Sequence, residues 1–270
     1  TELAPKLNTE DIQFLLKCSD FLNGELQGAG PWKPKTKIDG CYVIYGLCSL
    51  LHKLQNHKEV KAFCNKITSL SIMGDSHIEL KHLGIFTKLQ DLELNAKGDM
   101  QSSSGWSELP KTLKILTINN TRVETLDWDE KTYSDLEIIR MKSCEVDETS
   151  SFCKLPTLAE LKIVLTRRYR SEPKTDQRHF GPKLESLHLN GFGLTGLDWE
   201  KMPNLKKANI SGNFESDLTL ITDSKIVELE ISTRNIVGFS LSNQSQLKSC
   251  NFRAYDYQHT PSKDRHIDIS

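Results

Sequence analysis

A hydrophobic triplet of the form apolar-x-x-apolar-x-apolar recurs nine times along this chain, and it constrains the fold more than any other feature. Successive copies begin 21 to 26 residues apart. Their first residues are Ile67, Leu89, Leu113, Leu136, Leu158, Leu184, Leu205, Ile226 and Leu247. A period in this range is typical of a solenoid, in which each repeat buries its apolar residues against its neighbours. Because such arrays usually present a surface rather than a catalytic pocket, the pattern also favours a binding role.

Each triplet predicts a short strand, because alternate residues of a strand point to opposite sides. The apolar residues then face the interior, and the intervening residues face outward. The central outward positions are Ser71, Glu93, Thr117, Arg140, Lys162, His188, Asn209, Glu230 and Asn251. The neighbouring outward positions are Met73, Asn95, Asn119, Lys142, Val164, Asn190, Ser211, Ser232 and Arg253. With strands ~4.8 Å apart, nine strands span roughly 38 Å, which is wide enough for a standard protein interface.

Three repeats show a longer pattern: LKILTINNTRV (113–123), LEIIRMKSCEV (136–146) and LESLHLNGFGL (184–194). They resemble leucine-rich repeats, whose strand signature is L-x-x-L-x-L-x-x-N/C-x-L. Cys144 and Asn213 fall on the N/C position, whereas other repeats place unrelated residues there, such as Thr166 and Arg234. The usual ladder of asparagines is therefore mostly missing. The resemblance implies an α/β solenoid: a leucine-rich-repeat horseshoe with a parallel β-sheet on its concave face and a helical N-terminal cap.

The triplet divides the chain into two regions. Residues 1–64 do not fit the repeat, and their apolar spacing predicts a helical N-terminal cap, with helices near 9–22, 41–55 and 58–65. Residues 65–270 form the predicted leucine-rich-repeat solenoid of about nine repeats. A cap is expected because a terminal repeat would otherwise expose its apolar side. At the other end, the alternating residues 265–270 predict one last edge strand.

Residues 113–128 align without gaps on residues 184–199, and this alignment explains a match to a nucleotide-binding motif. Gly191, Gly193 and Gly196 have the G-x-G-x-x-G spacing, but they lie inside one repeat without the strand–helix units of a dinucleotide site. Both aligned segments end in Asp-Trp, so we expect each tryptophan to pack between coils and each aspartate to cap the next turn. Hydrolase, metalloprotease and P-loop motifs are absent from the sequence. We therefore expect no catalytic residue, cofactor, metal site or enzyme activity.

The charge balance excludes a general attraction to polyanions. The 270 residues include 35 basic and 36 acidic side chains, for a net charge of -1. No apolar run approaches the ~18 residues of a membrane-spanning helix, so we expect no membrane insertion. The 7 cysteines cannot all pair within one chain, and most lie in apolar contexts. Their pattern favours reduced thiols and an intracellular location, with secretion as the alternative.

Charge along the predicted outward face is banded. Asp91 and Glu93 are acidic, the middle of the face is basic, and Glu228 and Glu230 are acidic again. A uniform nucleic-acid stripe would not be interrupted in this way, whereas a protein partner with alternating charge would match the bands. The predicted partner-binding residues are Glu93, Thr117, Arg140, Lys142, Lys162, Arg167, Arg168, Tyr169, Arg170, His188, Asn209 and Glu230.

The primary hypothesis is a non-enzymatic protein-binding module, acting as a receptor, adaptor or scaffold. One alternative is recognition of nucleic acid or a phosphate ligand through the basic insert at 167–178, where Tyr169 adds a stacking surface. The insert belongs to the longest step between triplets, from Leu158 to Leu184. A second alternative is the substrate-recognition subunit of a larger enzyme complex.

Overall fold

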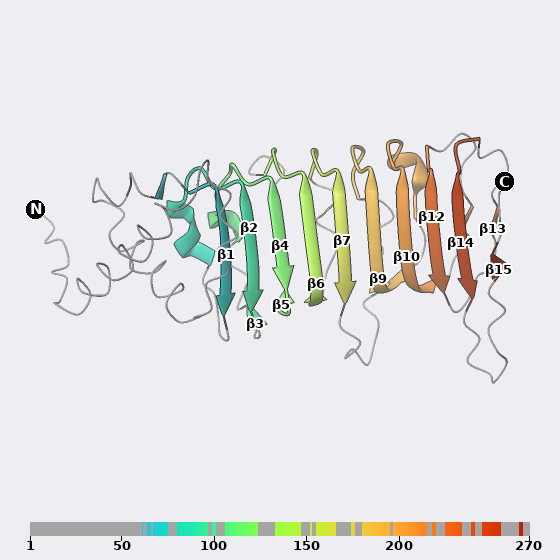
Figure 1. Ribbon diagram of the computed structural model, residues 1–270, viewed down its shortest axis with the longest axis horizontal. Helices are drawn as coiled ribbons and strands as arrows, with labels where there is room; N and C mark the ends of the chain where they lie inside the picture. The colour runs from blue at the N-terminus through green and yellow to red at the C-terminus, as the bar shows by residue number, and fades with distance from the viewer. Residues whose placement is uncertain are drawn as a thin grey trace, which may run out of the picture. The chain divides into compact units, whose positions relative to one another are not determined.

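The computed structural model of this chain is a parallel-strand β-solenoid (Figure 1). Every structural statement below concerns the described residues, which all lie in one compact unit spanning residues 38–270. The described residues are 61, 64–65, 67–74, 80–96, 99–100, 106–123, 133–146, 152, 155–165, 174–175, 180–194, 197–214, 218–219, 225–233, 239–240, 245–254 and 265–266.

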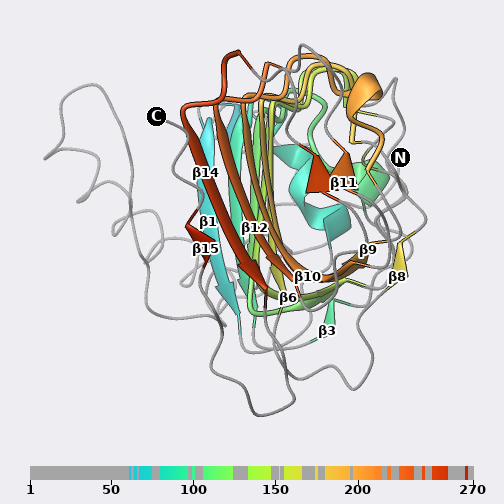
Figure 2. The same cartoon turned by 90° about the vertical axis from the view of Figure 1, so that its right-hand side faces the viewer.

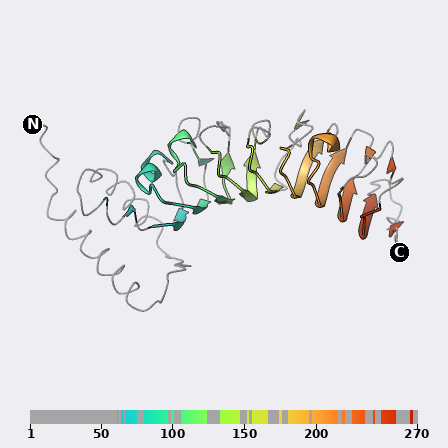
Figure 3. The same ribbon diagram turned by 90° about the horizontal axis from the view of Figure 1, so that it is seen from above.

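The hydrophobic triplets form the strands that they predict. Nine of the described strands pair in parallel, each with the strand of the next repeat (Figure 1). In spatial order they are β1 (Ser69–Gly74), β2 (Asp91–Ala96), β4 (Ile115–Asn119), β6 (Ile138–Val146), β7 (Glu160–Leu165), β9 (Ser186–Leu194), β10 (Lys207–Phe214), β12 (Glu228–Thr233) and β14 (Ser249–Ala254). Seen from above, the row of strands bends gently, and the sheet lies on the inner side of the bend (Figure 3).

The remaining described strands have two residues each. They are β3 (Asp99–Met100), β5 (Arg122–Val123), β8 (Lys174–Thr175), β11 (Leu218–Thr219), β13 (Phe239–Ser240) and β15 (Arg265–His266). β15 pairs antiparallel with β14, which confirms the last edge strand expected from the alternating sequence.

The expected α/β class is not confirmed. The helical elements of the described residues are three short 3-10 helices: η1 (Leu80–Ile85), η2 (Trp106–Glu108) and η4 (Trp199–Lys201). Viewed along the row, they lie across the interior from the sheet (Figure 2). The short steps between triplets leave few residues for each return to the sheet, and a 3-10 turn suits short connectors. Nearly all of the predicted N-terminal cap, residues 1–64, lies outside the described residues, and one hydrogen bond from Asn65 to Lys61 does not establish it.

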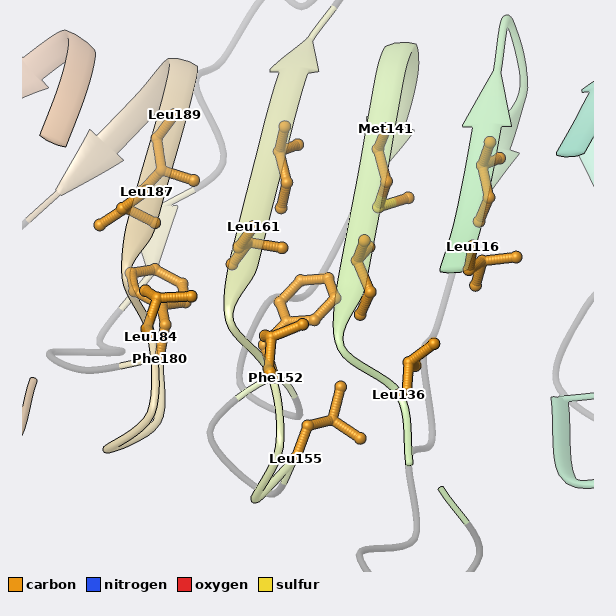
Figure 4. Packing of buried hydrophobic residues seen from close by; sticks show 14 of the residues in the cluster. Leu116, Leu136, Met141, Phe152, Leu155, Leu161, Phe180, Leu184, Leu187 and Leu189 are labelled. Atoms are coloured by element: carbon orange, nitrogen blue, oxygen red, sulfur yellow. The ribbon is translucent and has the colours of Figure 1, made fainter. Parts of the chain in front are cut away.

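The core is built from the inward residues of the triplets. Leu116, Leu161 and Leu189 are inaccessible to solvent, and inward side chains of successive strands, such as Met141 and Leu161, lie beside one another (Figure 4). A second set of buried residues comes from the return segments, the stretches that lead from one strand of the sheet to the next. Each of six successive return segments places one aromatic ring in the core. These residues are Phe86, Trp106, Tyr133, Phe152, Phe180 and Trp199. Rings this large fill the space between sheet and return segments.

The Asp-Trp prediction is half correct where it can be checked. Trp199 is buried, as expected. Asp198 occupies the N-cap position of η4, but its side chain makes no capping hydrogen bond. Its carboxylate instead lies 3.4 Å from the Lys201 ammonium, so the expected cap is wrong for this residue. The earlier pair, residues 127–128, lies outside the described residues.

In some repeats, side chains of the turns before the strands bond the backbone of the preceding coil. The Thr112 hydroxyl donates to the Leu89 carbonyl at 2.8 Å, and the Thr157 hydroxyl donates to the Leu136 carbonyl at 3.0 Å. Each bond joins one coil to the preceding coil. Cys144 acts in the same way from the N/C position, since its thiol donates to the Ile118 carbonyl at 3.2 Å. These bonds satisfy backbone carbonyls that face the coil interior.

The N/C position follows a backbone irregularity that only some repeats have. Seven residues after the first triplet leucine, Asn120, Ser143 and Gly191 have φ values of 56°, 55° and 90°. Strand register shifts at Ser143, so that Cys144 pairs with Leu165. At Gly191, an added Cβ would lie 3.1 Å from the Leu165 Cβ, which explains this glycine of the G-x-G-x-x-G match. Gly191 is therefore the extra residue of a bulge in β9.

Candidate functional site

The outward side chains of the nine parallel strands form one continuous surface, here named the exposed sheet face. Backbone register aligns its central column as Ser71, Glu93, Thr117, Arg140, Lys162, His188, Asn209, Glu230 and Asn251. Seven of the predicted partner-binding residues therefore lie in a single column, and Lys142 lies in the next column, beside Val164 and Asn119.

Arg140 is already paired within the face. Its Nε and Nη2 donate to the two carboxylate oxygens of Glu160 at 2.7 Å and 3.2 Å. This two-point hydrogen bond raises the pKa of Arg140, and the Glu160 charge adds to the effect. Because both side chains are partly exposed, the pair contributes at most about 1 kcal/mol to stability. Its larger effect is to neutralise Arg140, which the sequence presents as a charged anchor.

Lys142 and Lys162 differ from Arg140 because their side chains are exposed and unneutralised. They lie diagonally on the adjacent strands β6 and β7. Among the described residues, no carboxylate lies within ion-pair distance of either ammonium group. The basic middle of the face therefore consists mainly of these two lysines.

Two carboxylates on β2 form the acidic end of the face. Glu93 accepts hydrogen bonds from the Ser71 hydroxyl and the Asn119 amide, both at 3.1 Å. Partial burial raises the pKa of Asp91, and the neighbouring Glu93 charge raises it further. These neutral donors orient Glu93 without cancelling its charge. The negative charge of β2 thus remains directed at the surface.

The carboxylates of the second acidic band, Glu228 and Glu230 on β12, are bonded by neighbouring side chains. The Lys207 ammonium lies 2.8 Å from the Glu228 carboxylate, and the Asn209 amide donates to Glu230 at 2.5 Å. The two acidic ends of the face are consequently not equivalent. β2 carries two carboxylates that form no ion pair within the described residues, with the Arg140 charge partly opposing the rise in the Asp91 pKa, whereas β12 retains only Glu230.

His188 lies between the lysine pair and the second acidic band. Partial burial lowers its pKa, and the charge of Lys162 lowers it further, while Glu230 opposes the shift. We predict that an NMR titration of His188 gives a midpoint below 6.5. Lys162→Gln should raise that midpoint because it removes one positive neighbour, and Glu230→Gln should lower it. An unchanged midpoint in Lys162→Gln would show that the two side chains do not interact.

An apolar pair on the exposed sheet face was missed by the sequence reasoning. Ile115 on β4 and Ile138 on β6 are register neighbours and are both partly exposed. They belong to a third outward column, which lies two residues before Thr117 and Arg140 along their strands. The signal was available in the sequence, since an outward position of a strand is expected to be polar. Neighbouring exposed apolar residues indicate an interaction surface more strongly than isolated ones do.

The predicted basic insert cannot be placed. Arg167, Arg168, Tyr169 and Arg170 lie outside the described residues. Within 167–178, the described part is β8, which pairs in parallel with the end of β9. These four residues therefore stay a prediction from the sequence.

The described cysteines have no sign of a chemical role. Cys64, Cys144 and Cys250 are buried and carry no disulfide. Burial raises the pKa of both Cys64 and Cys144 to about 11, which keeps these thiols protonated at neutral pH. The described residues contain no group of three or more His, Cys, Asp or Glu side chains suited to a metal ion. Nor do they contain a helix long and apolar enough to cross a membrane.

Comparison of the chain with protein-family models, with curated proteins and with solved structures finds no match in any of the three.

Proposed function

We propose that this chain is a non-enzymatic protein-binding module of the leucine-rich-repeat type, acting as a receptor, adaptor or scaffold. The observation that carries the proposal is the exposed sheet face, where nine strands hold side chains of segregated charge in register. Its three columns contain five acidic and five basic residues. Charges that alternate along a surface select the orientation and register of a protein partner.

Two structural details support the leucine-rich-repeat assignment. The inner curvature of the sheet matches the concave surface that such arrays use for binding (Figure 3). The Cys144 thiol lies inside the coil and bonds the Ile118 carbonyl of the preceding repeat, as the N/C position requires. The return segments are poorer in helix than an α/β horseshoe, so the proposed assignment rests on the strand side of the repeat.

The same face argues against nucleic acid as the main ligand. A polyanion would meet Asp91 and Glu93 on one side of the lysines and Glu230 on the other. Phosphate contacts require a run of basic residues, because each neutralised phosphate adds to affinity. Recognition of the substrate of a larger enzyme complex would use the same protein-binding face.

A site-specific photo-crosslinker tests the proposal. Thr117→p-benzoylphenylalanine places the probe in the middle of the face, and Glu200→p-benzoylphenylalanine places it on η4, across the interior from the sheet. In extract of the cells that make the protein, we expect a protein adduct from position 117 that is absent from position 200. Identical adducts at both positions, a nuclease-sensitive adduct at 117, or no adduct at 117 would each contradict the proposed function.

A further inference from the structure

Three kinds of side chain follow one another across strands β2 to β7 of the exposed sheet face. The carboxylates Asp91 and Glu93 come first, on β2. The apolar pair Ile115 and Ile138 follows on β4 and β6. The lysine pair Lys142 and Lys162 comes last, on β6 and β7. These strands are consecutive neighbours in the sheet, so the order acidic, apolar, basic is a fixed property of the fold.

Neither of these two charged groups forms an ion pair within the described residues. In the described structure, Arg140 is paired with Glu160, and Lys207 is paired with Glu228. The β2 carboxylates form no such ion pair: Ser71 and Asn119 donate to Glu93, and the Arg140 charge partly opposes the rise in the Asp91 pKa. A partner can therefore gain ion pairs here without first breaking internal ones.

The isoleucine pair forms the apolar surface between the β2 carboxylates and the lysine pair. Ile115 and Ile138 alternate with buried residues along their strands, so both point outward, and in their column they lie between Asp91 and Glu160. Covering them with an apolar side chain removes both from water, which favours association. A partner with charges alone would leave this pair exposed.

The spacing between strands gives the distance from the acidic group to the basic group. From β2 to the midpoint of β6 and β7 is two and a half strand spacings, or ~12 Å. Alternate residues of an extended segment cover ~13 Å from the first to the fifth residue. Residues four apart on a helix cover ~12 Å from the first to the ninth. Either backbone can therefore place three side chains over the three groups.

We infer that the face binds a protein segment that presents a basic, an apolar and an acidic side chain in that order over ~12 Å. The basic group meets Asp91 and Glu93, the apolar group covers Ile115 and Ile138, and the acidic group meets Lys142 and Lys162. This inference rests on the proposed function and specifies its partner.

Selection from a random dodecapeptide phage library on the full chain tests the inference. Peptides selected on the wild-type protein should share the three side chains with the apolar one in the middle, in either chain direction. Three double variants should each remove one requirement. Asp91→Asn with Glu93→Gln removes the basic residue, Ile115→Ser with Ile138→Ser removes the apolar residue, and Lys142→Gln with Lys162→Gln removes the acidic residue.

A synthetic peptide of the selected sequence should bind each double variant about tenfold more weakly than the wild type, as expected for losing two exposed contacts. A shared sequence without this order, equal binding to all variants, or no enrichment would overturn the inference. The crosslinking result at Thr117 is independent of these outcomes. A protein adduct there with a failed selection would reject the charge order and retain the binding function.

Discussion

Leu187→Asp should abolish the cooperative unfolding transition of the solenoid. Leu187 is 1% exposed, lies near the start of β9, and pairs in register with Leu161 on one side and Ala208 on the other. Losing a buried leucine costs about 2–5 kcal/mol, and the buried carboxylate has no described partner to offset its desolvation. The sum is comparable with the whole stability of a typical domain, about 5–15 kcal/mol.

Chemical denaturation followed by far-UV circular dichroism measures this effect. Asn190→Asp is the matched control, because it places the same carboxylate on the same strand but facing solvent. The control should change the free energy of unfolding by less than about 0.5 kcal/mol. If Leu187→Asp unfolded at the same denaturant concentration as the control, the inward orientation of this residue would be wrong.

Lys142→Glu combined with Lys162→Glu should weaken binding of the protein crosslinked at Thr117 by about 100-fold or more. Like charges placed opposite each other across an interface cost several kcal/mol, and each factor of ten corresponds to about 1.4 kcal/mol. Both side chains are exposed, so folding should be unaffected. Calorimetry with the isolated partner gives the affinity, and denaturation confirms the fold.

The matched control reverses two other lysines. Lys206 is paired with Glu185 at 2.7 Å, and Lys225 donates to Asn204 at 3.1 Å; both precede strands distant from the lysine pair. Lys206→Glu with Lys225→Glu changes net charge equally but should leave affinity within about threefold of the wild type. An equal loss in both double variants would indicate a general charge effect, and no loss in either would exclude the lysine pair as the binding anchor.

The strand side of this fold is predictable because it follows from alternation alone. The positions of Leu116 and Leu161 inside, and of Thr117 and Lys162 outside, need only the triplet and the pleat of a strand. The return side is not predictable in this way. A segment such as 106–108 forms a 3-10 turn where the chain has to bring an aromatic ring into the core. The number of residues between that ring and the next triplet differs from repeat to repeat.

The limits of prediction at the candidate site are electrostatic and local. Sequence register places Arg140 in the basic band, but only side-chain geometry shows that Glu160, one strand away, neutralises it. Uniform spacing also does not predict where the next inward residue falls. Leu165 and Thr233 are buried seven residues after the first triplet residue, whereas Thr121 and Cys144 are buried eight residues after it. The difference is the extra residue of the bulge, as at Ser143.

The extra residue of the bulge, which some repeats have and others lack, has a consequence for how the chain accommodates insertions and deletions. The three outward columns all lie before it in each repeat, so one residue can be gained or lost there while every outward side chain keeps its column. Asn120 and Ser143 show the longer form, and the repeat with Leu165 shows the shorter form, within one unbroken ladder. A change of one residue at this position therefore leaves the geometry of the exposed sheet face upstream of it unchanged, while the side chains of that face can vary.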